Sequence, residues 1–158
     1  MRVVDIIAGT TVDGPGLRTS IYFAGCAHHC PGCQNPHTHS PSAGKDMTLD
    51  ELLTVIDEQQ FDVTFTGGDP FFQAEEILPL AIAVKERGYN LWCYTGFTYE
   101  QAMASTVISR LMQYIDVLVD GPYIDEQRDV TLPFRGSANQ RLIDVGKSST
   151  ERIVEYVP

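Results

Sequence analysis

The sequence predicts an α/β fold, a partial, open (β/α) barrel of about five to six units with a parallel sheet. The first observation is order, because short apolar strand-like runs alternate with segments of helical periodicity along the 158 residues. The second is length, since a closed eight-unit barrel takes about 250 residues, roughly 30 per unit. We therefore expect one domain over residues 1–158, with right-handed crossovers and a site at the carboxyl ends of the strands.

The predicted strands are rich in β-branched and aromatic residues. They span residues 19–23, 62–66, 91–94, 117–119 and 141–145. Glycines follow the first four of them: Gly25, Gly67, Gly68, Gly96 and Gly121. Glycine turns at these positions are expected where a parallel sheet presents its ligand crevice.

Three helices are predicted from capping boxes, apolar periodicity and a glycine stop. The capping box Thr48–Glu51 opens the first, and apolar side chains recur at i, i+3, i+4 and i+7 from Leu49. The second covers about 73–87 and ends at Gly88. Another capping box opens the third helix, which covers about 98–112.

Composition and charge exclude several classes of partner. The net charge of −10 argues against nucleic acid, because phosphate binding needs a basic surface. Asp5 interrupts the apolar N-terminal run, so we expect no secretory signal, and no apolar stretch is long enough for a membrane span. Three of the four cysteines are clustered, which indicates metal-binding thiols in the cytoplasm and no disulfide framework.

The segment Cys26-Ala-His-His-Cys30-Pro-Gly-Cys33 carries the clearest chemical signal, with the spacing C-x3-C-x2-C. An iron–sulfur cluster held by protein alone normally takes four thiolates, so three leave one iron open to a small molecule. A structural Zn²⁺ is the alternative, because four histidines lie among or near these cysteines. A zinc site would normally draw a second C-x2-C pair, which the chain lacks, and Cys93 is predicted to be a core residue.

The run Thr66-Gly67-Gly68-Asp69-Pro70 ends the second predicted strand of the alternating core. In a parallel sheet this position faces the ligand crevice. Glycines there let backbone groups approach a ligand closely, and Asp69 adds a hydrogen-bond acceptor. The alternative is an ordinary Gly-Gly turn in which Asp69 begins a helix.

Together, the cysteine spacing and the Gly-Gly-Asp run resemble the radical S-adenosylmethionine (SAM) enzymes. The resemblance implies a [4Fe–4S] cluster on the three clustered cysteines, with an open iron that chelates the amino and carboxylate groups of SAM. It also implies that backbone groups of the run Gly67, Gly68 and Asp69 hold the methionine ammonium, with Asp69 in place of the commoner glutamate.

The same resemblance suggests further SAM contacts. Most radical SAM enzymes carry an aromatic residue near adenine, just before the third cysteine, and this chain has Gly32 there. Backbone groups of Gly32 and Gln34, on either side of Cys33, or another side chain, would hold adenine instead. Thr95 and Asp120 end strands where a relative binds a monovalent cation beside the methionine carboxylate, and ordinary turn chemistry is the alternative.

Further runs between residues 5 and 145 resemble one branch of these enzymes, the anaerobic ribonucleoside-triphosphate reductase activating proteins. They are Asn35-Pro36, Leu91–Gly96, Asp120–Tyr123 and Phe134–Arg141. Upstream, Asp13-Gly14-Pro15-Gly16 is similar to the segment before the cluster in activating enzymes of glycyl-radical proteins more widely. The resemblance implies reductive cleavage of SAM and formation of a glycyl radical on the reductase, with a one-electron donor such as a flavodoxin. Three alternatives stay open: a pyruvate formate-lyase activating enzyme, a radical enzyme for a small metabolite, and a non-catalytic zinc-binding interaction module.

Overall fold

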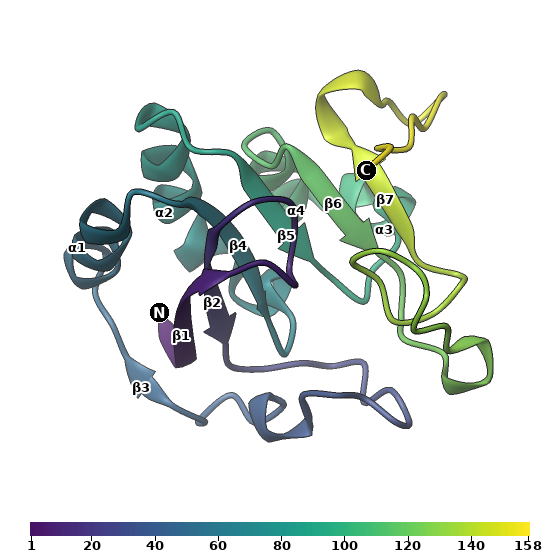
Figure 1. Cartoon of the computed structure of the whole chain (residues 1–158), viewed down its shortest axis with the longest axis horizontal. Helices are drawn as coiled ribbons and strands as arrows, with labels where there is room; N and C mark the ends of the chain where they lie inside the picture. Colours follow the sequence, from purple (N-terminus) through teal and green to yellow (C-terminus); the bar gives the residue numbers. More distant parts are fainter.

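The computed structural model describes residues 1–158. They form one seven-stranded sheet, and the connections between its central strands contain the helices (Figure 1). The strands are β1 (Arg2–Thr10), β2 (Arg18–Phe23), β3 (Lys45–Asp46), β4 (Asp62–Gly67), β5 (Leu91–Tyr94), β6 (Val117–Asp120) and β7 (Arg141–Asp144). Their order in the sheet is β3-β1-β2-β4-β5-β6-β7. The helices are α1 (Leu49–Gln59), α2 (Ala74–Glu86), α3 (Tyr99–Ala104) and α4 (Thr106–Met112). Short 3-10 turns lie at Pro36–Thr38, Pro70–Gln73, Asp125–Gln127 and Val145–Lys147.

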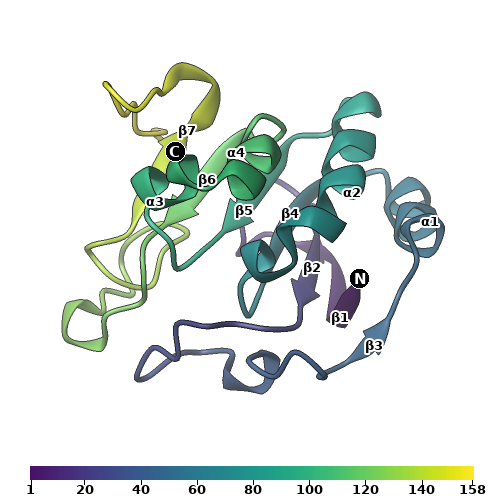
Figure 2. The same ribbon diagram turned by 180° about the vertical axis from the view of Figure 1, so that it is seen from behind.

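The centre of the sheet is parallel, as predicted. Strands β2, β4, β5 and β6 pair in parallel, and each connection between them carries one or two helices. Figure 2 shows that these helices cover one face of the sheet. None of them is long and apolar enough to cross a membrane.

The expectation of five to six units with a parallel sheet is wrong at both edges. The chain completes three strand–helix–strand crossovers, and β1 and β7 pair antiparallel to their neighbours β2 and β6. The β1–β2 connection, residues 11–17, is shorter than the roughly dozen residues that a parallel crossover needs. No α-helix lies between β6 and β7, so that connection forms no further unit. The sheet is open at β3 and β7, and a barrel-like curvature stays a prediction.

Alternation along the strands divides the buried side chains between two faces. Phe65 and Cys93 point toward the helices and belong to a core of 23 buried residues. Trp92 and Val119 belong to a smaller cluster on the other face. The β1–β2 connection arches across that second face, where Gly14 packs on Trp92 (Figure 1). The central strands are therefore buried on both sides.

Both predicted capping boxes are confirmed, but the third helix is interrupted. The side chains of Thr48 and Thr98 each accept a hydrogen bond from the backbone three residues on, and Glu51 and Gln101 return one. Ser105 is extended and its side chain accepts from the backbone of Ile108, so it ends α3 and caps α4. A serine that bonds to nearby backbone competes with a continuous helix in this way.

Arg18 fixes the β1–β2 connection to the sheet from a fully buried position. Its Nη1 donates to the carbonyl of Pro15 (3.0 Å), its Nε to Thr64 Oγ1 (2.8 Å) and its Nη2 to Asn90 Oδ1 (2.9 Å). The guanidinium lies 5.6 Å from the ring centre of Trp92, and burial lowers the pKa of Arg18. This arginine holds the Asp13–Gly16 turn over the sheet, beside the cavity described next.

Candidate functional site

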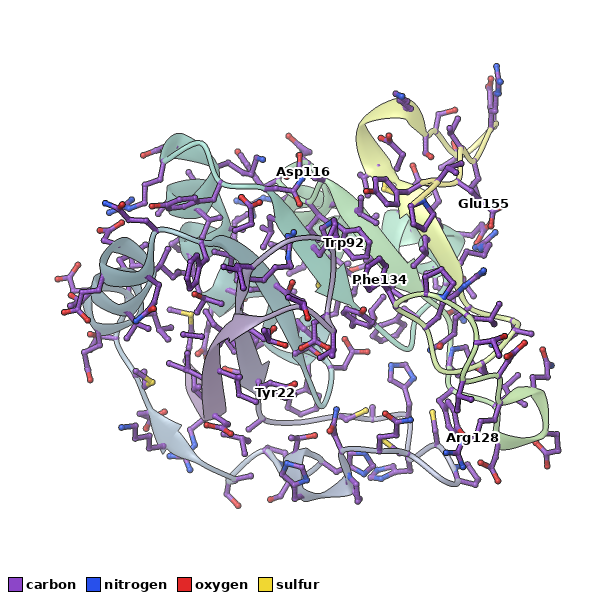
Figure 3. All side chains as sticks on the ribbon, in the orientation of Figure 1. Tyr22, Trp92, Asp116, Arg128, Phe134 and Glu155 are labelled. Atoms are coloured by element: carbon purple, nitrogen blue, oxygen red, sulfur yellow. The ribbon has the colours of Figure 1, made fainter.

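A cavity of about 440 Å³ lies at the carboxyl ends of the parallel strands, where the crevice was predicted. Its walls come from the segment between β2 and β3, from the ends of β4 and β5, and from residues 121–140. Cys26, Cys30, Cys33, Gly67, Gly68, Thr95 and Tyr123 are among the lining residues. Figure 3 shows the sulfur atoms of the β2–β3 segment below the strands, with Arg128 on the facing loop.

The three clustered cysteines are half-buried, free of disulfides and line this one cavity. Burial raises the pKa of Cys26, while the backbone N–H groups of His28 and His29 donate toward its sulfur and oppose that rise. The backbone N–H of Asn35 donates to Cys33 Sγ at 3.4 Å. No three His, Cys, Asp or Glu side chains converge on one point in the manner of a single-ion site.

Cys93 lies apart from the other cysteines. It is fully buried in the helix-side core and does not line the cavity. Burial raises the pKa of its thiol well above the ordinary value. The structure therefore places Cys93 in the core, as predicted from its apolar strand.

The Gly67-Gly68 turn lines the cavity. It also packs against the cysteine segment, the connection between β2 and β3 that carries the three clustered cysteines. Gly67 has a positive φ of 118°, and a Cβ there would lie 2.4 Å from backbone atoms of Phe23. A Cβ on Gly68 would lie 2.4 Å from the carbonyl oxygen of Gly25 and 2.9 Å from that of Thr38. The glycines therefore allow two backbone segments to meet, in addition to leaving room for a ligand.

Asp69 is 1% exposed and does not line the cavity. Its Oδ1 accepts from the backbone N–H of Phe71 (3.0 Å), so it caps the 3-10 turn Pro70–Gln73, as the alternative interpretation predicted. Its Oδ2 accepts from Thr95 Oγ1 (2.9 Å) and from the Gly96 N–H (3.0 Å), and lies 2.7 Å from His28 Nε2. This hydrogen bond raises the pKa of His28.

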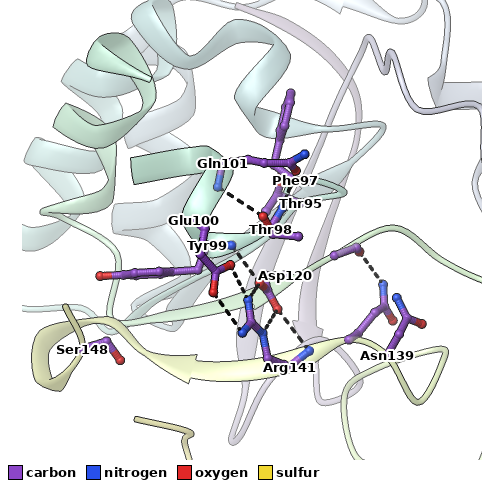
Figure 4. Close-up of polar contacts among 12 residues, drawn as sticks. Thr95, Phe97, Thr98, Tyr99, Glu100, Gln101, Asp120, Asn139, Arg141 and Ser148 are labelled. Carbon is purple, nitrogen blue, oxygen red and sulfur yellow. Dashed lines mark hydrogen bonds and ion pairs between the residues drawn. The ribbon is translucent and has the colours of Figure 1, made fainter. Parts of the chain in front are cut away.

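The two residues predicted beside a monovalent cation lie in different surroundings. Thr95 lines the cavity, whereas Asp120 is 1% exposed and does not. Both oxygens of Asp120 are engaged, because Arg141 donates to each and the backbone N–H of Tyr99 donates to Oδ2 at 2.8 Å (Figure 4). The arrangement of Asp120 is that of an ion pair at a strand end.

Gly32 also lies outside the cavity, although Gln34 lines it. Gly32 has a φ of +76°, and a Cβ there would lie 2.7 Å from Asp125 Oδ1 and 3.3 Å from the Tyr123 ring. A Cβ on Gly136 would lie 3.1 Å from the same ring. Tyr123 thus stands between two glycines and faces the cavity, and it was not among the predicted site residues. The sequence offered one signal for Tyr123: the absence of an aromatic residue before Cys33 suggests that an aromatic side chain from elsewhere in the chain takes that place.

Comparison with known proteins identifies the family. The 4Fe-4S single cluster domain family matches residues 12–143. The anaerobic ribonucleoside-triphosphate reductase-activating protein of Vibrio cholerae is 37% identical, over 82% of this chain and 88% of that protein. Those of Escherichia coli K12 and bacteriophage T4 are 30% and 34% identical, over 82% and 83% of this chain and 89% and 86% of theirs. The chain belongs to the anaerobic ribonucleoside-triphosphate reductase-activating family. This confirms the branch expected from the sequence.

The fold has a relative among solved structures. QueE from Escherichia coli aligns with a TM-score of 0.52 at 18% identity, covering 75% of this chain and 68% of that one. At this identity the likeness supports the α/β architecture alone.

In this member of the reductase-activating family, the run Phe134–Arg141 lies in the loop between β6 and β7, which lines one side of the cavity. Gln140 Oε1 accepts from the backbone of Gly136 (2.9 Å), and its Nε2 donates to the Gly121 carbonyl (3.1 Å). Asn139 Nδ2 donates to the carbonyl of Pro122 at 2.7 Å. These amide side chains bond to the backbone of the protein itself and fix the two ends of the loop to each other. The same loop contributes Arg128 and Arg135 to the cavity, and the β1–β2 connection contributes Asp13; none of the three was among the predicted site residues.

Proposed function

We propose that this protein cleaves SAM reductively at a [4Fe–4S] cluster and generates a glycyl radical on an anaerobic ribonucleoside-triphosphate reductase, in the cytoplasm, as a single radical SAM domain. One observation carries the proposal. Cys26, Cys30 and Cys33 line one cavity together with Gly67 and Gly68, at the carboxyl ends of parallel strands, in a chain of this family.

The donor set fits the proposed cluster. Three free thiols share the cavity, and the backbone N–H of Asn35 donates to Cys33 Sγ, a contact typical of cluster sulfur ligands. When bound, the cluster supplies one electron that breaks the S–C5′ bond of SAM, giving methionine and a 5′-deoxyadenosyl radical that takes an α-hydrogen from glycine. The protein contributes binding, orientation and exclusion of water.

The proposed SAM contacts follow the cavity wall. Gln34, Gly67, Gly68 and Thr95 face the cavity, so we assign them to direct contact with SAM, beside Cys33. Gly32, Asp69 and Asp120 lie outside it and act on the site only through their neighbours. Because both oxygens of Asp120 are already bonded, we assign no cation to it.

Tyr123 supplies the aromatic surface that the cysteine motif lacks. Its ring faces the cavity from the loop after β6 and is flanked by Gly32, where an aromatic side chain was expected. An aromatic ring in this place offers adenine a stacking surface. We therefore assign adenine to Tyr123.

The test begins with anaerobic iron–sulfur reconstitution, followed by iron and sulfide analysis. Addition of dithionite and SAM should then release 5′-deoxyadenosine. A protein that takes up zinc and no cluster, or a cluster that leaves SAM intact, would overturn the proposal. Replacing dithionite by a reduced flavodoxin tests the proposed electron donor separately.

The partner is tested by electron paramagnetic resonance (EPR). The reconstituted protein is mixed anaerobically with SAM, reductant and either the reductase or pyruvate formate-lyase, and the glycyl-radical doublet is recorded. We expect the doublet with the reductase. A doublet with the lyase alone would replace the partner and leave the SAM chemistry standing.

A further inference from the structure

His28 lies between the first two cysteines and is held from three sides. Its Nε2 lies 2.7 Å from Asp69 Oδ2, and its ring meets that of Phe97 edge-on, with 4.6 Å between the ring centres. A Cβ on Gly96 would lie 2.5 Å from the imidazole, so the glycine makes room for it. The side chain of His28 is 18% exposed and that of Asp69 is 2% exposed.

The carboxylate of Asp69 is buried and committed to protein partners, with three hydrogen bonds on Oδ2 and one on Oδ1. A carboxylate accepts about four hydrogen bonds. Asp69 receives four, from the backbone of Phe71 and Gly96 and from the side chains of Thr95 and His28. It therefore joins the end of β4, the end of β5 and the cysteine segment at one buried point.

His28 is the one residue between Cys26 and Cys33 whose side chain hydrogen-bonds to the rest of the protein. The backbone of the same stretch hydrogen-bonds to a residue outside it at Cys26, whose N–H donates to the His39 carbonyl at 3.1 Å. The Cys33 N–H donates within the stretch, to Cys30. Residues flanking the stretch also meet the turn, because the Asp69 N–H donates to the Gly25 carbonyl (2.7 Å) and Asn35 Nδ2 donates to the Gly67 carbonyl (3.5 Å). Between those two points, the bond from His28 to Asp69 is the side-chain hydrogen bond that links the stretch to the end of β4.

We propose that His28 and Asp69 form a positioning pair that holds the cysteine segment in register with the Gly67-Gly68 turn. The pair rests on the proposed function, because its purpose is to align the cluster ligands with the SAM contacts. Asp69 is then a positioning residue and makes no contact with the methionine ammonium. The side chain of aspartate is shorter than that of the commoner glutamate, and here the imidazole of His28 extends from the cysteine segment to meet it.

Two substitutions separate the hydrogen bond from packing. His28→Phe keeps a ring on Phe97 and cannot donate, whereas His28→Gln retains an N–H donor near the position of Nε2. His37→Phe, at an exposed histidine of the same segment, is the matched control. Hydrogen exchange of residues 26–33 is measured on the metal-free proteins, and SAM affinity on the reconstituted proteins by the change in the cluster EPR spectrum.

We expect His28→Phe to exchange faster over residues 26–33 and to bind SAM about 10-fold or more weakly, as for other residues that orient metal ligands. His28→Gln and His37→Phe should resemble the wild type in both measurements. Wild-type behaviour of His28→Phe, or failure of His28→Gln to restore it, would overturn the pair. A wild type that binds no cluster or SAM would instead overturn the proposed function, while the exchange measurement would still test the pair.

Discussion

The guanidinium of Arg141 donates to both carboxylate oxygens of Asp120, with Nε 3.1 Å from Oδ1 and Nη2 2.5 Å from Oδ2 (Figure 4). Its Nη2 also lies 2.8 Å from Glu100 Oε2, so one arginine on β7 joins β6 and α3. These hydrogen bonds raise the pKa of Arg141. A two-pronged arginine–carboxylate contact of this kind is among the stronger polar interactions in proteins.

Arg141→Met should destabilise the protein by about 3 kcal/mol, because it leaves the carboxylate of Asp120 buried without its cation. Urea unfolding of the metal-free protein measures the change. Lys147→Met is the control, since Lys147 lies 3.8 Å from Asp144 at the surface and should contribute less than about 1 kcal/mol. Equal losses in the two variants would show that the Asp120 pair has no special weight.

Stability should fall in acid partly through Glu100. The hydrogen bond from Arg141 lowers the pKa of Glu100 below its ordinary 4.5. Because the folded pKa is the lower one, the contribution is fully present above the unfolded pKa and is lost as pH falls through the folded pKa. Glu100→Gln should therefore be less stable than the wild type near pH 7, by under about 1 kcal/mol at this exposed position. The difference should shrink as pH falls below 4.5 and vanish below the folded pKa in urea titrations, and a gap independent of pH would contradict this origin.

The cysteines should separate into two groups. Cys26→Ala, Cys30→Ala and Cys33→Ala should each lose the cluster and all SAM cleavage, because each thiolate is assigned to a different iron. Cys93→Ala should keep both, at a cost of about 1 kcal/mol for a small core side chain. Iron content and visible absorption after reconstitution decide the matter. Loss of the cluster in Cys93→Ala with retention in one of the others would refute the assignment.

Tyr123 should matter through its ring. Tyr123→Ala should weaken SAM binding roughly 5-fold or more, because an aromatic contact contributes about 1 kcal/mol beyond its buried area. Tyr123→Phe loses only the hydroxyl that donates to Asp125 (2.9 Å) and should bind SAM like the wild type. Titration of SAM against both reconstituted variants tests this. Equal SAM affinity of the wild type and both variants would contradict the assignment of the adenine contact to Tyr123.

Local signals in the sequence predicted the centre of the fold and the gathering of the cysteines at one end of it. The capping boxes and the strands that end at glycine are read from neighbouring residues, and parallel strands bring their carboxyl ends together. The antiparallel edges were not predicted, because Asp5 interrupts the apolar pattern of β1 and because strand direction depends on distant pairing.

The roles of the two strand-end aspartates depend on partners far along the chain. Asp69 meets His28, 41 residues away, and Asp120 meets Arg141, 21 residues away. Before such pairing is known, an aspartate that ends a strand looks the same whether it faces a ligand or a counterion. The cysteines and the Gly67-Gly68 turn line one cavity at the carboxyl ends of the strands, because the chain enters both segments directly from a strand end.

The contact between Gly68 and the carbonyl of Gly25 has a consequence for engineering and for evolution. A methyl group at residue 68 would collide with backbone, which has no rotamer by which to move aside. An alanine substitution in this turn would thus first displace the backbone of the cysteine segment. A loss of SAM cleavage in such a variant would then reflect failed assembly of the cluster as much as weaker binding of SAM. Any descendant that gains a side chain at residue 68 must reroute the chain around Gly25 in the same step.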